Sequence, residues 1–120
     1  SKNASIAAQC TNDQGKFWEF HKILYANQGP IDSGWVNTGN LKKFASRIQG
    51  MDMTKFNSCV DNQKYKSIVD NDTAFAYKSG FQGTPTLIVE KSDGSDPQVL
   101  LGAYPFPVLQ AILDKKISGG

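Results

Sequence analysis

The stretch that decides the fold is "SGFQGTPTLIVE", Ser79–Glu90, in which a Gly-Thr-Pro-Thr turn precedes the most strand-like run of the chain. Proline lacks a backbone N–H and has a fixed φ, so it occurs at strand entrances and tight turns and not inside a sheet. An X-Pro bond is also where a cis peptide costs little, about 0.5–1 kcal/mol. Pro85 therefore marks either an ordinary turn or a cis-proline loop beside an active site.

Length and composition restrict the class of protein. A chain of 120 residues with 39% apolar and 20% charged residues is typical of one soluble globular domain with a modest core. The 13 Lys and Arg residues barely exceed the 11 Asp and Glu residues, so we expect no nucleic-acid partner. No run of about 18 apolar residues is present, and the N-terminus lacks the pattern of a signal peptide.

The sequence holds two cysteines and one histidine, which is too few for the usual four ligands of a structural zinc site. We therefore expect no metal and no cofactor. Cys10 and Cys59 both fall on apolar helix faces that can meet, which favours a disulfide formed in an oxidising compartment. Two free buried thiols in a cytosolic protein are the alternative.

Apolar periodicity predicts five helices before the first strand. They cover residues 4–13, 14–28 and 41–49, a short segment after Asp52, and a longer one from residue 62 or 63 to Tyr77. Asn40 and Asp52 are the expected N-caps, and Gly50 and Gly80 the expected ends. The side chains expected to point inward from the third and fourth helices are Leu41, Phe44, Ala45, Ile48, Met53, Phe56 and Val60.

Two runs after the proline turn have strand composition, Thr86–Glu90 and Gln98–Tyr104. The polar segment between them contains Asp93-Gly94, which predicts an antiparallel hairpin. A last helix is expected over residues 107–116, after the strand-breaking Pro105. An isolated hairpin is only marginally stable, and three consecutive apolar residues in the first run predict a strand that is buried on both faces. We therefore expect the rest of the sheet to lie outside this chain.

Several of these segments in order resemble the DsbA-like thiol-disulfide oxidoreductases. They are "AAQCTNDQGKFWEFHKILYANQ", "LKKFASRIQGMDMTKFNSCVDN", "GFQGTPTLIVE" and "GAYPF", and the resemblance runs from about Ala4 to Leu113. It implies an α/β fold of the thioredoxin type, with a helical insertion over residues 1–80 and the C-terminal half of the fold over residues 81–120. The family acts on cysteine-containing protein substrates in extracytoplasmic compartments.

In that family the Gly-Thr-Pro-Thr element is the cis-proline loop that lies against a Cys-x-x-Cys dithiol and helps to bind substrate peptide. The resemblance thus assigns Gly83, Thr84 and Pro85 to substrate binding. Backbone groups there can pair with an extended peptide, as in strand addition. It also matches Cys10 and Cys59 with positions at which some members carry a second, non-catalytic disulfide, whose role is structural.

The chain departs from the family because neither cysteine belongs to a Cys-x-x-Cys pair. We expect it to be the C-terminal part of a DsbA-like protein, an incomplete thioredoxin-like fold that is inactive alone. A non-catalytic peptide-binding or interaction module is the alternative. The unpaired edge of Thr86–Glu90 is expected to pair with another copy of the chain.

The second helix carries the single histidine and several aromatic residues. No nucleophile can be paired with His21 from the sequence, so we interpret it as a structural residue. The aromatic side chains of this helix are expected in the core, and the alternative is a hydrophobic contact surface; they are Phe17, Trp18, Phe20 and Tyr25.

Overall fold

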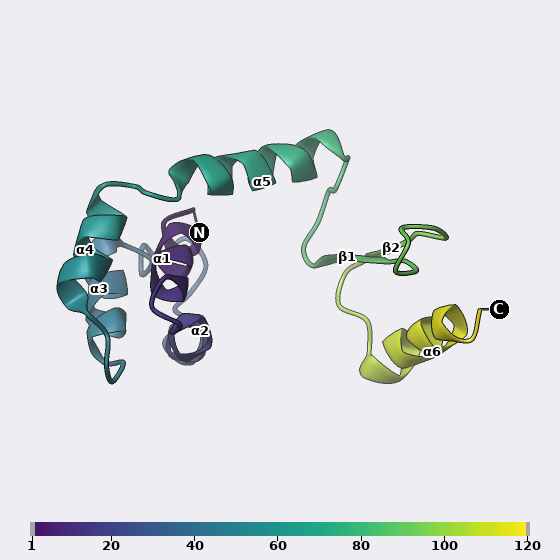
Figure 1. Ribbon diagram of the computed structural model, residues 1–120, viewed down its shortest axis with the longest axis horizontal. Helices are drawn as coiled ribbons and strands as arrows, with labels where there is room; N and C mark the ends of the chain where they lie inside the picture. Colours follow the sequence, from purple (N-terminus) through teal and green to yellow (C-terminus); the bar gives the residue numbers. More distant parts are fainter. Residues whose placement is uncertain (1, 120) are drawn as a thin grey trace. The chain divides into compact units, whose positions relative to one another are not determined.

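The computed structural model describes residues 2–119, which form two compact units, Ser1–Ala74 and Phe75–Gly120. Six helices and one hairpin are found among these residues, and Figure 1 labels them along the chain. The elements in chain order are α1 (Lys2–Asn12), α2 (Phe17–Ala26), α3 (Thr38–Ser46), α4 (Met53–Asp61), α5 (Lys66–Lys78), β1 (Thr86–Val89), β2 (Gln98–Leu101) and α6 (Phe106–Ile117). The predicted order of five helices, a hairpin and a terminal helix is confirmed.

The start of α3 differs from the prediction. Asn37, and not Asn40, is the N-cap: its side-chain oxygen accepts a hydrogen bond of 2.8 Å from the backbone N–H of Asn40. The Asn40 side chain instead donates to the carbonyl of Trp35, at 2.8 Å. Both asparagines lie before the apolar stripe, and the extended backbone of Asn37 is what permits it to cap. The predicted Asp52 cap of α4 is confirmed, because its carboxylate accepts from the Lys55 N–H at 3.1 Å.

Two helices begin later than predicted because the preceding helix ends in a left-handed turn. Gly15 has φ +68°, and the N–H of Lys16 bonds the carbonyl of Thr11, which closes α1 before α2 begins at Phe17. Gln63 has φ +55°, and the N–H of Lys64 bonds the carbonyl of Cys59. Both are C-terminal caps of the Schellman type. Gln63 thus ends α4 and does not start α5.

The core of the first unit is formed by α1 to α4 with one residue of α5. Its two largest fully buried members are Phe20 of α2 and Phe56 of α4, whose ring centroids are 6.2 Å apart. The predicted inward residues Leu41, Phe44 and Ala45 of α3 are buried, and so is Ile48, which follows the end of the helix at Ser46. The buried core residues of this unit are Ile6, Ala7, Cys10, Phe20, Leu41, Phe44, Ala45, Ile48, Phe56, Val60 and Val69.

The expectation of a buried aromatic face on α2 is wrong for two residues. Phe20 is 0% exposed, but Trp18 is 68% and Tyr25 63% exposed. A helix of 3.6 residues per turn turns only one stripe toward the core, and Phe20, Ile23 and Leu24 occupy that stripe. On α5 only Val69 is buried, and Phe75 is 66% exposed.

In the second unit, β1 and β2 form an antiparallel pair in the register Thr86↔Leu101, Leu87↔Leu100, Ile88↔Val99 and Val89↔Gln98. Both strands are shorter than predicted. Val89 and Leu100 are buried, whereas Leu87 and Ile88 are exposed, so the expected burial on both faces is not found within residues 2–119. One face of the pair carries Ile88, Val99 and Leu101, which are 46%, 53% and 60% exposed.

Helix α6 packs beside the hairpin, as the yellow helix and green strands of Figure 1 show. Leu113 lines a small cavity together with the buried Val89. The Nζ of Lys116 donates to the backbone carbonyl of Asp96 at 2.6 Å and pairs with its carboxylate at 3.0 Å. These contacts fix α6 to the end of the hairpin connection. None of the helices between residues 2 and 119 is long and apolar enough to cross a membrane.

Candidate functional site

The sequence-predicted loop Gly83–Pro85 lies at the entrance to β1 and is exposed. The Thr84–Pro85 peptide bond is cis. Two hydrogen bonds fix the backbone around it: Thr86 Oγ1 donates to the carbonyl of Gly83 at 2.5 Å, and Gly102 N–H donates to the carbonyl of Pro85 at 2.8 Å. The loop is therefore held from the strand side while its outer surface faces solvent.

The backbone N–H and C=O groups of residues 85–88 point alternately toward β2 and away from it. The carbonyl of Pro85 accepts a hydrogen bond from the N–H of Gly102. Backbone polar groups point to alternate sides along a strand, so the N–H and C=O of Leu87, two residues later, also point toward β2. The N–H and C=O groups of Thr86 and Ile88 then lie along the opposite, outer edge. Within residues 2–119 the sheet has two strands, so this edge of β1 is unpaired. None of the hydrogen bonds between described residues involves Thr84.

The two cysteines of the chain form a disulfide between α1 and α4, with Cα atoms 5.9 Å apart. Cys10 is buried in the core, and Cys59 is half-buried. The disulfide belongs to the first unit and the Gly83–Pro85 loop to the second. The two cysteines are thus fully used by one covalent bond, and these 120 residues hold no free dithiol.

A charged cluster beside the disulfide was not anticipated from the sequence. Asp13, in the turn after α1, accepts a hydrogen bond from the Tyr65 hydroxyl and pairs with the Lys64 ammonium at 2.9 Å. The hydrogen bond from Tyr65, and then the one from Lys64, hold the pKa of Asp13 below its usual value. The same carboxylate raises the pKa of Lys64 and of Tyr65. Residues more than fifty positions apart carry no sequence signal for such a cluster.

A second link joins the same turn to the start of α4. The Gln14 side chain accepts from the backbone N–H of Asp52 at 2.8 Å and donates to its carbonyl at 3.1 Å. Gln14 thus satisfies both backbone groups of the residue that caps α4. Gln14 therefore fixes the turn between α1 and α2 to the start of α4, and Asp13 fixes the same turn to the segment after α4.

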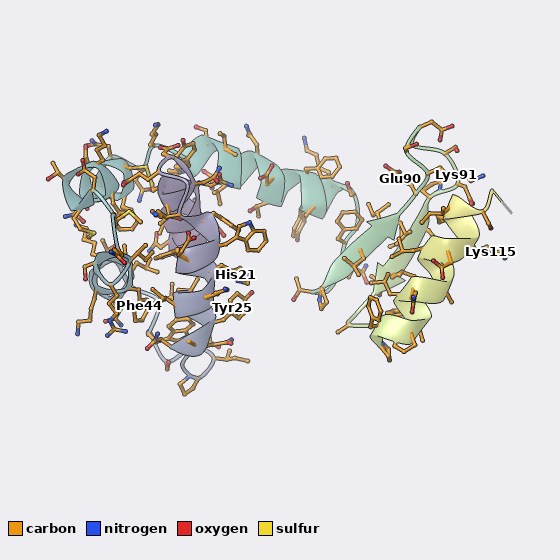
Figure 2. The ribbon with its side chains drawn as sticks, turned by 60° about the horizontal axis from the view of Figure 1, so that its bottom comes forward. His21, Tyr25, Phe44, Glu90, Lys91 and Lys115 are labelled. Atoms are coloured by element: carbon orange, nitrogen blue, oxygen red, sulfur yellow. A yellow bond between two sulfur atoms is a disulfide. The ribbon has the colours of Figure 1, made fainter. Side chains whose placement is uncertain are left out.

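The exposed aromatic side chains of α2 contact one another. His21 and Tyr25, labelled in Figure 2, stack with ring centroids 4.6 Å apart, and Trp18 meets His21 edge-on at 5.4 Å. Phe17 completes the row, at 5.0 Å from Trp18. His21 is half-buried against these rings, in agreement with its interpretation as a structural residue.

A metal centre has no candidate in the part of the chain that the structure describes. Within residues 2–119 no group of three or more His, Cys, Asp or Glu side chains gathers in a geometry that can hold a metal ion. The exposed Gly83–Pro85 loop, with the unpaired strand edge into which it leads, is the candidate site.

Comparison with known proteins gives one matching family, Thioredoxin, over residues 1–99. Disulfide bond formation protein D of Bacillus subtilis (strain 168) is 23% identical over 121 aligned positions, which cover 99% of this chain and 52% of that protein. A Rickettsia conorii protein named as a protein-disulfide oxidoreductase is 24% identical over 119 positions, covering 96% of this chain and 39% of the relative.

A third relative is the Na⁺/H⁺ antiporter NhaA 1 of Salinispora arenicola, which is 31% identical over 86 positions. That match covers 72% of this chain and only 12% of the antiporter. The chain thus spans about half of the Bacillus protein and smaller shares of the other two. No solved structure matches the chain at a significant level.

Proposed function

Because this chain belongs to the thioredoxin family, among its DsbA-like thiol-disulfide oxidoreductases, we propose that it is the substrate-binding part of a protein that exchanges disulfides in cysteine-containing proteins. In this proposal residues 1–80 are the helical insertion and residues 81–120 the C-terminal half of the fold. Gly83, Thr84 and Pro85 bind the substrate, and a dithiol from outside these 120 residues performs the exchange.

The observation that carries the proposal is the exposed Gly83–Pro85 loop, which leads into β1. Thr84 takes part in none of the hydrogen bonds found between described residues, whereas the outward groups of Thr86 and Ile88 are expected to pair with the rest of the sheet in the intact protein. An extended peptide segment that pairs with the backbone of Thr84 gains hydrogen bonds without regard to its side chains. Such a mode suits a protein that acts on many unfolded substrates.

Strand addition is tested by NMR titration of the isotope-labelled chain with the S-alkylated B chain of insulin. We expect the amide signal of Thr84 to shift, because its backbone N–H forms a new hydrogen bond. A B-chain peptide that is N-methylated at alternate residues is the control, since it lacks the necessary donors. Shifts that are equal for both peptides, or confined to α2, contradict the proposal.

A matched pair of variants isolates the backbone contribution of Thr84. Thr84→Ala removes the side chain and keeps the N–H, whereas Thr84→Pro removes the N–H. The proposal expects weaker peptide binding for the proline variant and near-normal binding for the alanine variant. Equal loss in both variants assigns the effect to the hydroxyl group instead and contradicts the backbone mode.

The chain is proposed to lack exchange activity when it is alone. Both of its cysteines are held in the Cys10–Cys59 disulfide, which joins two helices and is not a vicinal pair. A Cys-x-x-Cys motif works because a helix N-terminus stabilises the first thiolate and the second cysteine resolves the mixed disulfide. Neither condition is met by cysteines 49 residues apart on α1 and α4.

An extracytoplasmic location, in the periplasm, at the cell surface or in the medium, is proposed for this protein. The disulfide supports it, because such bonds persist in oxidising compartments and are rare in the cytosol. The substrates are then secreted proteins with cysteines. Thiol alkylation of intact cells tests the proposal: a cytosolic protein is recovered with two alkylated cysteines, and an extracytoplasmic one with none.

A non-catalytic peptide-binding or interaction module is the second candidate function. The exposed aromatic row of α2 favours it, since Trp18 and Tyr25 offer an amphipathic contact surface. Mass spectrometry of the protein isolated from its own cells distinguishes the two. A natural product of these 120 residues supports the interaction module, and a longer product with a Cys-x-x-Cys motif rules it out.

A homo-oligomer is proposed to form through the edge of Thr86–Glu90. Ile88, Val99 and Leu101 lie exposed beside the unpaired backbone groups of β1, and exposed edges of this kind template pairing with another chain. Two copies related by a two-fold axis can pair their β1 strands antiparallel.

A further inference from the structure

A cavity of about 840 Å³ opens over the disulfide in the first unit, and both cysteines line it. The two sulfur-bearing residues differ in exposure: Cys10 is 1% exposed and belongs to the core, whereas Cys59 is half-buried. A nucleophile that enters from solvent therefore meets the Cys59 side before the Cys10 side. The two cysteines therefore differ in how accessible they are to a nucleophile that enters the cavity.

The charge of the cavity is positive. Lys55, Lys64 and Asp13 all line it, and the Lys64–Asp13 pair at 2.9 Å offsets one cation against one anion. Lys55 is exposed and takes part in none of the ion pairs found among residues 2–119. The other lining side chains are neutral hydroxyl and amide groups, from Gln14, Thr54, Ser58 and Asn62.

We propose that this cavity is a thiol-exchange site, at which an anionic low-molecular-weight thiol attacks the Sγ of Cys59. The thiolate forms a new S–S bond with Cys59 Sγ. The Cys10–Cys59 bond breaks with its electron pair on Cys10 Sγ, which then takes a proton from water. The products are S-thiolated Cys59 and a free Cys10 thiol, and because the reaction is an exchange it consumes no further oxidant or reductant.

The charge preference follows from the lysines. An incoming thiol with a negative group is attracted by the Lys55 ammonium, and a thiol with a positive group is repelled, most strongly at low ionic strength, where exposed charges are least screened. This site uses neither the Gly83–Pro85 loop nor the edge of β1. The inference therefore stands independently of the proposed peptide-binding function.

The experiment exposes the native protein at low ionic strength to three thiols: 2-mercaptoethanesulfonate, which is anionic, 2-mercaptoethanol, which is neutral, and cysteamine, which is cationic. Acid quenching and mass spectrometry of peptides locate the adduct and give the rate per thiolate. We expect the adduct on Cys59, and an anionic-to-cationic rate ratio that Lys55→Gln lowers by about threefold to fivefold. Lys43→Gln on α3, outside the cavity, is the matched control and leaves the ratio unchanged.

Salt provides a second readout, because exposed charges are screened within about 8–10 Å at physiological ionic strength. The wild-type ratio falls as salt rises, and the Lys55→Gln ratio changes less. Adducts on Cys10, a rate ratio that is the same in the wild type and Lys55→Gln, or a disulfide that reacts only after denaturation would each overturn the proposal.

Discussion

Cys10 and Cys59 are 49 residues apart in sequence, and their Cα atoms lie 5.9 Å apart where α1 packs against α4. The bond closes a loop that contains α2 and α3 and therefore most of the first unit. Three polar links, Asp13 to Lys64 and Tyr65 and Gln14 to Asp52, lie in the turns on either side of it. Covalent and polar contacts thus hold the same pair of helices.

Removing the disulfide is expected to destabilise the first unit by about 4 kcal/mol, because the unfolded chain regains the entropy that closing a loop of this length removes. The variant is Cys10→Ala/Cys59→Ala, since a serine hydroxyl at buried Cys10 adds an unpaired polar group. Urea denaturation of the double variant and of the wild type measures the free energy of unfolding. A difference below about 1 kcal/mol contradicts a structural role for the bond.

Phe20 and Trp18 are two positions apart on α2 and test the assignment of its faces. Phe20→Ala is expected to cost about 3–5 kcal/mol, because it empties a fully buried site against Phe56. Trp18→Ala removes a side chain that is 68% exposed and is expected to cost less than about 1 kcal/mol. Equal losses in thermal or urea unfolding of the two variants are incompatible with the observed faces.

The loss of folding stability at acid pH is expected to depend on Asp13. Its pKa is lower in the folded protein than in the unfolded chain, owing first to the Tyr65 hydroxyl and then to Lys64. Its contribution is therefore complete above the unfolded value of 3.8 and disappears as the pH falls through the folded value. Asp13→Asn is expected to flatten the loss of stability below about pH 4, whereas Asp72→Asn, at an exposed position of α5, does not.

Lys64 and Tyr65 act at the opposite limit of pH. Their pKa values are raised in the folded protein, so their contributions are present below the unfolded values of 10.5 and 10.0 and are lost as the pH rises through the folded ones. Urea titrations of the wild type and Asp13→Asn, from about pH 2 to above about pH 11, follow the stability at both limits. Parallel curves for the two proteins would exclude a stabilising role for the cluster.

Association through the β1 edge is expected to depend on Ile88. Ile88→Lys places a charge beside the unpaired backbone groups, as natural edge strands often do, and should shift the chain toward the monomer. Light scattering at increasing concentration measures the shift, and Val108→Lys, at an exposed position of α6, is the control. A wild type that remains strictly monomeric at high concentration disproves the proposed oligomer.

Much of the first unit could be predicted because its helices are indicated by the spacing of apolar residues that are close together in the sequence. The stripe Leu41, Phe44, Ala45 and Ile48 repeats with helical spacing, and all four residues are buried. The aromatic residues of α2 were harder, since aromatic identity alone does not say which stripe of a helix faces the core. Trp18 and Tyr25 instead meet His21 on the surface, and composition gives no signal for that arrangement.

The predicted start of α5 failed because a non-glycine residue adopts a left-handed conformation. Gln63 was assigned to the start of a helix, because most residues with φ > 0 are glycine and its sequence context is helical. The antiparallel hairpin followed from turn composition, but the exposure of Leu87 and Ile88 did not, since it depends on which strands lie beside β1. The Gly83–Pro85 loop was identified through a family resemblance, whose ordered motifs are more specific than the turn itself.

The central claim is that this chain supplies substrate binding and no redox dithiol. Its most direct test is the dithiothreitol-driven reduction of insulin, followed by turbidity, with the 120-residue chain beside an intact DsbA-like oxidoreductase. The account predicts that the chain leaves the uncatalysed rate unchanged while the intact enzyme accelerates it. Turnover by the chain comparable to that of the intact enzyme would contradict the claim.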